Sequence, residues 1–142
     1  MRSSRRQPDP APPVFFLDRG LGKHHVANVF AAAGFTVMLM TEVFPDDGQH
    51  VGDDEWIRRV SAEGWIALTK DVAIVRDHTE ALRRSSIRIF ALPNSNLTGL
   101  QMAERYRANL NRVVQRARKA GPFVDVVHPK RVERRWPPPA RS

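Results

Sequence analysis

Three aspartates stand where their carboxylates could act together. Asp18 ends the apolar stretch V-F-F-L-D, Asp71 ends I-A-L-T-K-D, and Asp54 belongs to the acidic pair that precedes W-I-R-R-V. Carboxylates that lie close together raise one another's pKa, and a hard cation such as Mg²⁺ or Mn²⁺, which prefers oxygen ligands, removes that penalty. A bound metal lowers the pKa of water and holds phosphate oxygens. Phosphodiester chemistry is therefore the reaction class that these residues indicate.

The elements that must position these aspartates alternate along the chain. Apolar runs predict strands at 14–17, 35–40, 65–68 and 87–92, and helical spacing predicts helices at 22–33, 53–63, 72–84 and 98–119, with a polar loop at 41–52. This order predicts an α/β fold with a mostly parallel sheet and helices on both faces. Sites in such sheets form at the carboxyl ends of the strands, where Asp18 and Asp71 are expected. Asp54 joins them if the preceding loop returns to that edge.

The ends of the chain complete the expected organisation. Residues 1–13 are rich in Arg, Ser and Pro and predict a disordered basic arm. Thr98 and Gln101 predict a capping box at the start of the long helix. Two short β segments at 123–127 and 131–135 are expected to pair as a hairpin around 128–130. Residues 14–135 then form the folded domain, and 136–142 form a tail.

Each aspartate also has a purely structural interpretation. Asp18 could end a strand at a turn, and Asp71 could cap the helix after it. Asp53 follows Gly52 and is expected to be the N-cap of the helix at 53–63. Asp54 would then share a face with Ile57 and point toward the sheet, because residues three apart are neighbours on a helix.

The composition limits the classes of protein and partner. The formal net charge is +8, with 23 Lys and Arg against 15 Asp and Glu, which favours a polyanion such as nucleic acid or an acidic protein, unless the surface is merely basic. The chain has no cysteine, so disulfides and thiolate metal sites are excluded. No apolar run reaches the roughly 20 residues of a membrane helix, and no apolar signal core follows the N-terminus. These features predict a cytoplasmic protein.

Basic residues near the expected site are candidate RNA contacts. Lys23 opens a helix beside Asp18, where backbone N–H groups could bind a phosphate, although an exposed polar helix start is the alternative. The long helix at 98–119 carries Arg105, Arg112, Arg116 and Lys119 opposite an apolar stripe. That basic stripe is either a solvated face or an RNA contact, and the sequence leaves both open.

The segment D-D-E-W-I-R-R-V-S-A-E-G-W-I-A-L-T-K-D resembles the second half of a PIN domain, and V-F-F-L-D resembles its first strand. The compact first half is similar to short PIN-like toxins of the VapC type. The terminal G-P-F-V-D-V-V-H-P-K-R-V-E-R also resembles that subgroup. The resemblance implies a three-layer PIN-like fold, a ribonuclease dependent on Mg²⁺ or Mn²⁺, a 5′-phosphate product and a small cognate antitoxin as partner. It leaves homodimer formation open.

Carried over by position, the resemblance implies that Asp18, Asp54 and Asp71 are the catalytic metal ligands. A further acidic ligand is expected, and the candidates are Glu42, Asp53 and Asp77. The function that this implies is an endoribonuclease, the toxin of a toxin–antitoxin pair. The alternative is a non-catalytic PIN-like module that binds RNA or protein.

Overall fold

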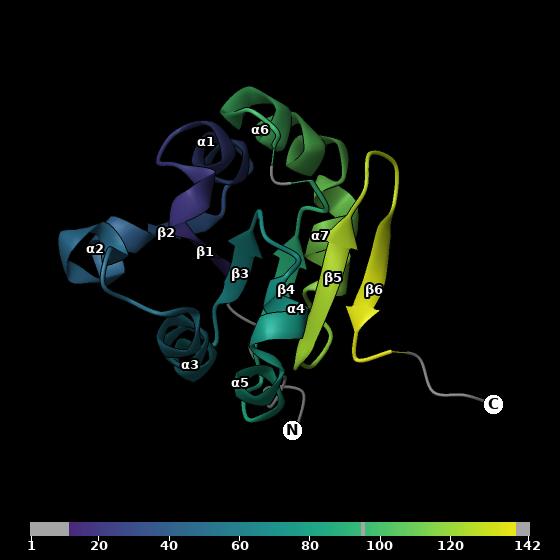
Figure 1. Cartoon of the computed structure of the whole chain (residues 1–142). Coiled ribbons are helices and arrows are strands. Elements are labelled where there is room, and N and C mark those ends of the chain that lie inside the picture. Colours follow the sequence, from purple (N-terminus) through teal and green to yellow (C-terminus); the bar gives the residue numbers. More distant parts are fainter. Residues whose placement is uncertain (1–11, 95, 139–142) are drawn as a thin grey trace, which may run out of the picture.

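A computed structural model describes residues 12–94 and 96–138 of the chain. Its centre is a six-stranded sheet in the order β2-β1-β3-β4-β5-β6 (Figure 1). The strands are β1 (Val14–Leu17), β2 (Thr36–Leu39), β3 (Ile66–Thr69), β4 (Arg88–Ala91), β5 (Phe123–Val127) and β6 (Val132–Trp136). Neighbouring strands from β2 to β5 are parallel, and β6 runs antiparallel to β5. The expected mostly parallel sheet and its terminal hairpin are confirmed.

Short helices connect the strands. They are η2 (Arg19–Leu21), α1 (His25–Ala32), α2 (Met40–Val43), η3 (Pro45–Gly48), α3 (Asp53–Glu63), α4 (Ile74–Asp77), α5 (Thr79–Arg83), α6 (Gly99–Ala108) and α7 (Leu110–Arg116). The helix expected at 53–63 has the bounds of α3, and Gly64 ends it in the left-handed conformation, at φ 73°. None of the helices in the described residues has the length and apolar character that a membrane crossing requires.

Two apolar clusters cover the two faces of the sheet and give the fold its three layers. Side chains alternate between faces along a strand, so Phe15 and Leu17 belong to one cluster and Phe16 to the other. The first cluster packs against α1, α6 and α7, and the second against α3, α4 and α5. The expected helices on both faces are therefore confirmed.

Three expected elements are corrected. The polar loop at 41–52 contains α2 and η3, the helix expected at 72–84 is divided into α4 and α5, and the helix expected at 98–119 is divided into α6 and α7. The last break falls at Asn109, whose buried side-chain amide donates hydrogen bonds to the carbonyls of Arg105 (2.9 Å) and His128 (2.8 Å). The predicted capping box is confirmed, because Thr98 accepts from the Gln101 N–H at 3.1 Å and Gln101 accepts from the Thr98 N–H at 2.8 Å.

The expected terminal segments fall largely outside the described residues. Apart from its last two residues, the basic arm expected at 1–13 lies there. Trp136, expected to begin the tail, instead ends β6 and packs against the second cluster. Residues 139–142 of that tail are again outside the described part.

Candidate functional site

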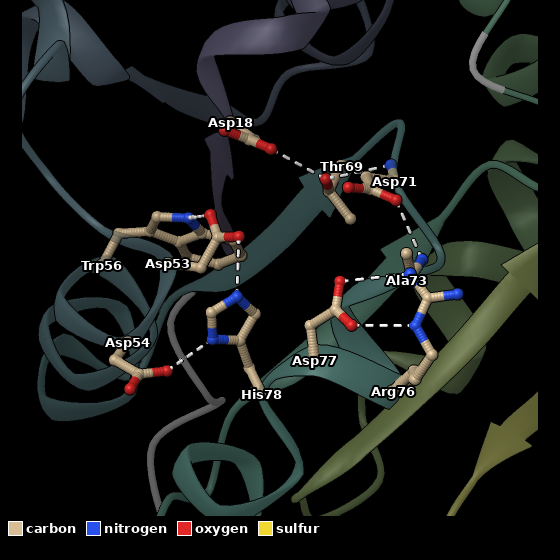
Figure 2. Close-up of polar contacts among 10 residues, drawn as sticks. All are labelled: Asp18, Asp53, Asp54, Trp56, Thr69, Asp71, Ala73, Arg76, Asp77 and His78. Atoms are coloured by element: carbon tan, nitrogen blue, oxygen red, sulfur yellow. Dashed lines mark hydrogen bonds and ion pairs between the residues drawn. The ribbon is translucent and has the colours of Figure 1, made fainter.

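Asp18 lies at the carboxyl edge of the sheet, between β1 and β3. Its backbone N–H donates to the carbonyl of Leu68 at 3.0 Å, which extends the pairing of the two strands by one residue. Its Oδ2 accepts a hydrogen bond of 2.8 Å from the hydroxyl of Thr69, the last residue of β3 (Figure 2). Burial raises the pKa of the Asp18 carboxyl, the Thr69 hydrogen bond partly opposes that rise, and the charges of Asp53 and Asp71 add to it.

Asp71 meets the same threonine two residues beyond β3. Its backbone N–H donates to Thr69 Oγ1 at 3.2 Å, so one hydroxyl contacts both Asp18 and Asp71. Its own Oδ1 accepts the N–H of Ala73 at 2.9 Å, which holds the turn before α4. Asp71 is exposed. The expected proximity of Asp18 and Asp71 is therefore confirmed, with Thr69 as the link between them.

Asp53 and Asp54 take different places from those expected. Gly52 is the N-cap of α3, because its carbonyl accepts the first helical hydrogen bonds, and Asp53 is already helical. The expectation that Asp53 caps the helix is therefore wrong. Its Oδ1 accepts a hydrogen bond of 2.7 Å from the indole of Trp56. Asp54, expected to point inward, is the more exposed of the two, with 67% of its side chain accessible against 41% for Asp53.

His78 connects these two aspartates. Its Nε2 lies 3.1 Å from Asp53 Oδ2, and its Nδ1 lies 2.7 Å from Asp54 Oδ1 (Figure 2). Both contacts are hydrogen bonds only when both ring nitrogens carry a proton, as in the imidazolium. The sequence analysis did not identify His78, and no local signal marks it, because it lies 24 residues from Asp54.

A cavity of about 400 Å³ opens in front of Asp18. It is lined by Asp18, Arg19, Gly20, Met40, Gly48, Gln49, Val51, Asp53 and Trp56. Asp54 instead lines a different cavity, together with residues of α3 and α5. The structure therefore groups Asp53, rather than Asp54, with Asp18.

The other expected ligands are engaged elsewhere. Glu42 accepts the backbone N–H of Leu39 at 2.8 Å and so holds the start of its own helix, α2. Asp77 forms an exposed ion pair with Arg76, at 2.8 Å from Nε to Oδ1, and the hydrogen bond from Arg76 lowers the pKa of the Asp77 carboxyl. Neither residue lines the cavity in front of Asp18.

The expected RNA-binding residues also differ from one another. Arg116 lies 2.5 Å from Oδ2 of Asp125, a fully buried carboxylate that Arg134 contacts from the other side at 2.7 Å. Arg105 donates to the carbonyl of Val127 at 3.3 Å. The exposed side chains of the group are Arg112 and Lys119, around α7, and Lys23, in the turn before α1.

Tyr106 contacts the strand that carries Thr69. The hydroxyl of this buried side chain, on α6, lies 2.8 Å from the carbonyl oxygen of Phe90 in β4 and 3.1 Å from that of Thr69 in β3, and its one proton is shared between the two acceptors. Burial raises the pKa of its hydroxyl well above the usual range, so the group remains a donor. Tyr106 thereby holds the strand end that carries Thr69.

The carboxylates of Asp18, Asp53 and Asp71 are suitable ligands for a hard divalent cation. In the structure, however, they do not point toward one common point. All three offer carboxylate oxygens, and the charges of Asp53 and Asp71 add to the pKa rise that burial causes at Asp18, a contribution that a cation would offset. In the described residues, no three acidic, histidine or cysteine side chains are grouped closely enough to hold a metal ion. Asp53 faces Trp56 and His78 instead, while Asp71 holds its own turn.

Comparisons with known proteins agree with this architecture. A family model described as "PIN like domain" matches residues 13–94, from the first strand to the loop after β4. A curated protein of Mycobacterium tuberculosis (strain ATCC 25618 / H37Rv), named "Putative ribonuclease VapC45", is 34% identical over 122 residues, which cover 84% of this chain and 88% of that protein. No solved structure matches the chain significantly. The chain therefore belongs to the PIN-like domain family, in its VapC-type group.

Proposed function

We propose that this protein is an endoribonuclease that depends on Mg²⁺ or Mn²⁺ and is the toxin of a toxin–antitoxin pair. The observation that carries this proposal is the sheet edge where Thr69 contacts both Asp18 and Asp71, and where burial, together with the charges of Asp53 and Asp71, raises the pKa of Asp18. The ribonuclease name of the M. tuberculosis relative and the net charge of +8 support RNA as the substrate. The VapC-type family supports a small cognate antitoxin as partner.

Asp18, Asp53 and Asp71 are the residues that we assign to the metal. When bound, the ion supplies a water of lowered pKa and a positive charge for phosphate oxygens. We choose Asp53 over Asp54 because Asp53 lines the cavity with Asp18, whereas Asp54 lies in another cavity.

The remaining residues keep these carboxylates in place. The Thr69 hydroxyl donates to Asp18 and accepts from the Asp71 N–H, which fixes the two chain segments relative to each other. His78 holds the first turn of α3 through Asp53 and Asp54. The cavity in front of Asp18 gives a scissile phosphate access to the edge of the sheet.

The engaged carboxylates also favour the second candidate, a non-catalytic module that binds RNA or protein. Asp53 and Asp71 each already accept hydrogen bonds, and a nuclease must release part of these contacts to bind metal. This alternative predicts RNA or protein binding without cleavage.

Cleavage of RNA by the purified full chain, freed of any partner, separates the two candidates. We expect the wild type to cleave RNA with Mg²⁺ or Mn²⁺ and not to cleave it in EDTA. The variants Asp18→Asn and Asp71→Asn should lose both cleavage and the Mg²⁺ binding that calorimetry measures. Glu63→Gln is the control, because its carboxylate is exposed and paired with Arg59 at the far end of α3, and it does not line the cavity in front of Asp18. Cleavage that continues in EDTA overturns the metal mechanism, and binding without cleavage establishes the module.

A further inference from the structure

Another cavity, of about 380 Å³, lies beside Asp71 and is lined in part by three cationic side chains. It is called the second cavity below, and the cavity in front of Asp18 is called the first. Lys70 directly follows β3, Arg76 comes from α4 and Arg135 from β6. In Figure 2, Asp71 and Arg76 lie to one side of Thr69, and Asp18 and Asp53 lie to the other. The two cavities therefore flank the hydrogen-bonded link from Asp18 through Thr69 to Asp71.

The two cavities differ in charge. The lining of the second holds Lys70, Arg76 and Arg135 against one carboxylate, that of Asp71, whereas the first holds two carboxylates and one arginine. A polyanion is attracted to the second cavity, and a cation to the first.

Arg76 keeps donors for a further anion. Its Nε and Nη2 donate to the two oxygens of Asp77, at 2.8 and 3.3 Å, which leaves the Nη1 donors outside this pair. Both side chains are at least half exposed, and ion pairs of this kind contribute little net free energy. A phosphate can therefore share the guanidinium or replace Asp77 at low cost.

Lys70 joins the two cavities. It lines the second cavity, while its aliphatic chain passes over Gly20, which lines the first. A Cβ placed on Gly20 would lie only 2.8 Å from Cε of Lys70. A chain that occupies both cavities therefore has to cross this lysine.

We propose that Lys70, Arg76 and Arg135 form the groove that binds the RNA backbone on the Asp71 side of the site. This inference rests on RNA being the substrate. It replaces the α6–α7 face as the main contact, because Arg116 is bound to Asp125 and Arg105 to a backbone carbonyl.

Binding of a labelled single-stranded RNA oligonucleotide of mixed sequence, measured by fluorescence anisotropy in EDTA, tests the groove without requiring cleavage. The test variant is Arg76→Gln/Arg135→Gln, and the control is Arg112→Gln/Lys119→Gln. Both variants remove two exposed positive charges, so any general effect of net charge is equal. Thermal melts confirm that both variants are folded.

We expect the groove variant to bind at least about tenfold more weakly and to lose roughly 1.4 from the log–log salt slope, at about 0.7 per phosphate contact on single strands. The control should bind within about twofold of wild type. Equal weakening of both variants, wild-type binding by the groove variant, or no RNA binding by the wild type overturns the proposal. RNA cleavage by the wild type, measured separately with Mg²⁺, shows whether the proposed activity stands independently of the groove.

Discussion

The hydroxyl of Thr69 donates a hydrogen bond of 2.8 Å to the carboxylate of Asp18, although 51 residues separate the two in sequence. The same oxygen accepts the N–H of Asp71. Thr69 is buried, with 1% of its surface accessible, so water does not readily replace either bond. One side chain thus contacts the carboxylate of Asp18 and the backbone N–H of Asp71, two of the three residues that we assign to the metal.

Thr69→Val, which keeps the shape but lacks the hydroxyl, should lower the free energy of unfolding by about 2 kcal/mol, since hydrogen bonds to charged groups contribute about 1.5–3 kcal/mol. RNA cleavage should fall with it, because Asp18 and Asp71 lose their common partner. Denaturant unfolding and cleavage assays measure the two effects. Thr69→Ser should restore both, and a fully active Thr69→Val would contradict the positioning role.

Because the pKa of Asp18 is raised, we expect Asp18→Asn to increase the free energy of unfolding in EDTA, by an amount that depends on pH. The folded carboxyl binds its proton more tightly than the unfolded one, so the free energy of unfolding falls as pH rises from the ordinary pKa of 3.8 through the raised folded value. Asparagine avoids this loss and still accepts from Thr69. The variant should melt at higher temperature than wild type at neutral pH, and the difference should disappear below the ordinary pKa.

Asp77→Asn is the control for that experiment, because the pKa of its carboxyl is lowered, and the sign of its effect is reversed. It should bring no gain in melting temperature at neutral pH. An Asp18→Asn variant that melts below wild type at neutral pH in EDTA would show that the carboxylate is not under electrostatic strain.

Asp53→Asn and Asp54→Asn form a matched pair, since each removes the charge from one contact with His78. Asp53→Asn should lose Mg²⁺ binding and cleavage altogether, because Asp53 lines the cavity with Asp18. Asp54→Asn should lose at most about tenfold in activity, the lower end of the range for groups that support a metal ligand. Calorimetry and cleavage assays on both decide the assignment, and the reverse order of effects would move the site to Asp54.

Arg116→Gln should lower the free energy of unfolding by about 3 kcal/mol, because it leaves the buried Asp125 carboxylate with Arg134 alone. Arg112→Gln, on the same helix but exposed, should change it by less than about 0.5 kcal/mol. Urea unfolding measures both values. Equal stability of the two variants would contradict a stabilising role for the pair of Arg116 with Asp125 and would instead support a solvated position for Arg116.

Local signals predicted the parts of the fold that depend on neighbouring residues. Helical spacing predicted the bounds of α3, and Thr98 with Gln101 predicted the start of α6. Alternation of apolar runs and helices gave the parallel sheet, and with it the meeting of Asp18 and Asp71 at one edge. Each of these features is set by interactions within a few residues or by the order of the elements.

The remaining features depend on partners that are distant in sequence. Asn109 interrupts the long helix because its amide also binds the carbonyl of His128, 19 residues away. Asp53 was expected as a cap by residue preference, but Trp56 and His78 engage its carboxylate within the helix. Trp56 is a helical neighbour of Asp53, three residues away, but His78 lies 24 residues from Asp54, so the choice between Asp53 and Asp54 required the structure.

The hydroxyl of Tyr106 has a consequence for the chain while it is being synthesised. A nascent chain that has emerged only as far as residue 94 already carries Thr69 and all the aspartates that we assign to the metal, but not the side chain that binds the ends of β3 and β4. The N-terminal part of a chain emerges first during synthesis, whereas a domain generally folds as a unit. The edge of the sheet therefore gains its contacts with Tyr106 only when α6 docks, late in translation, so a shorter ribosome-bound fragment lacks the side chain that contacts both Thr69 and Phe90.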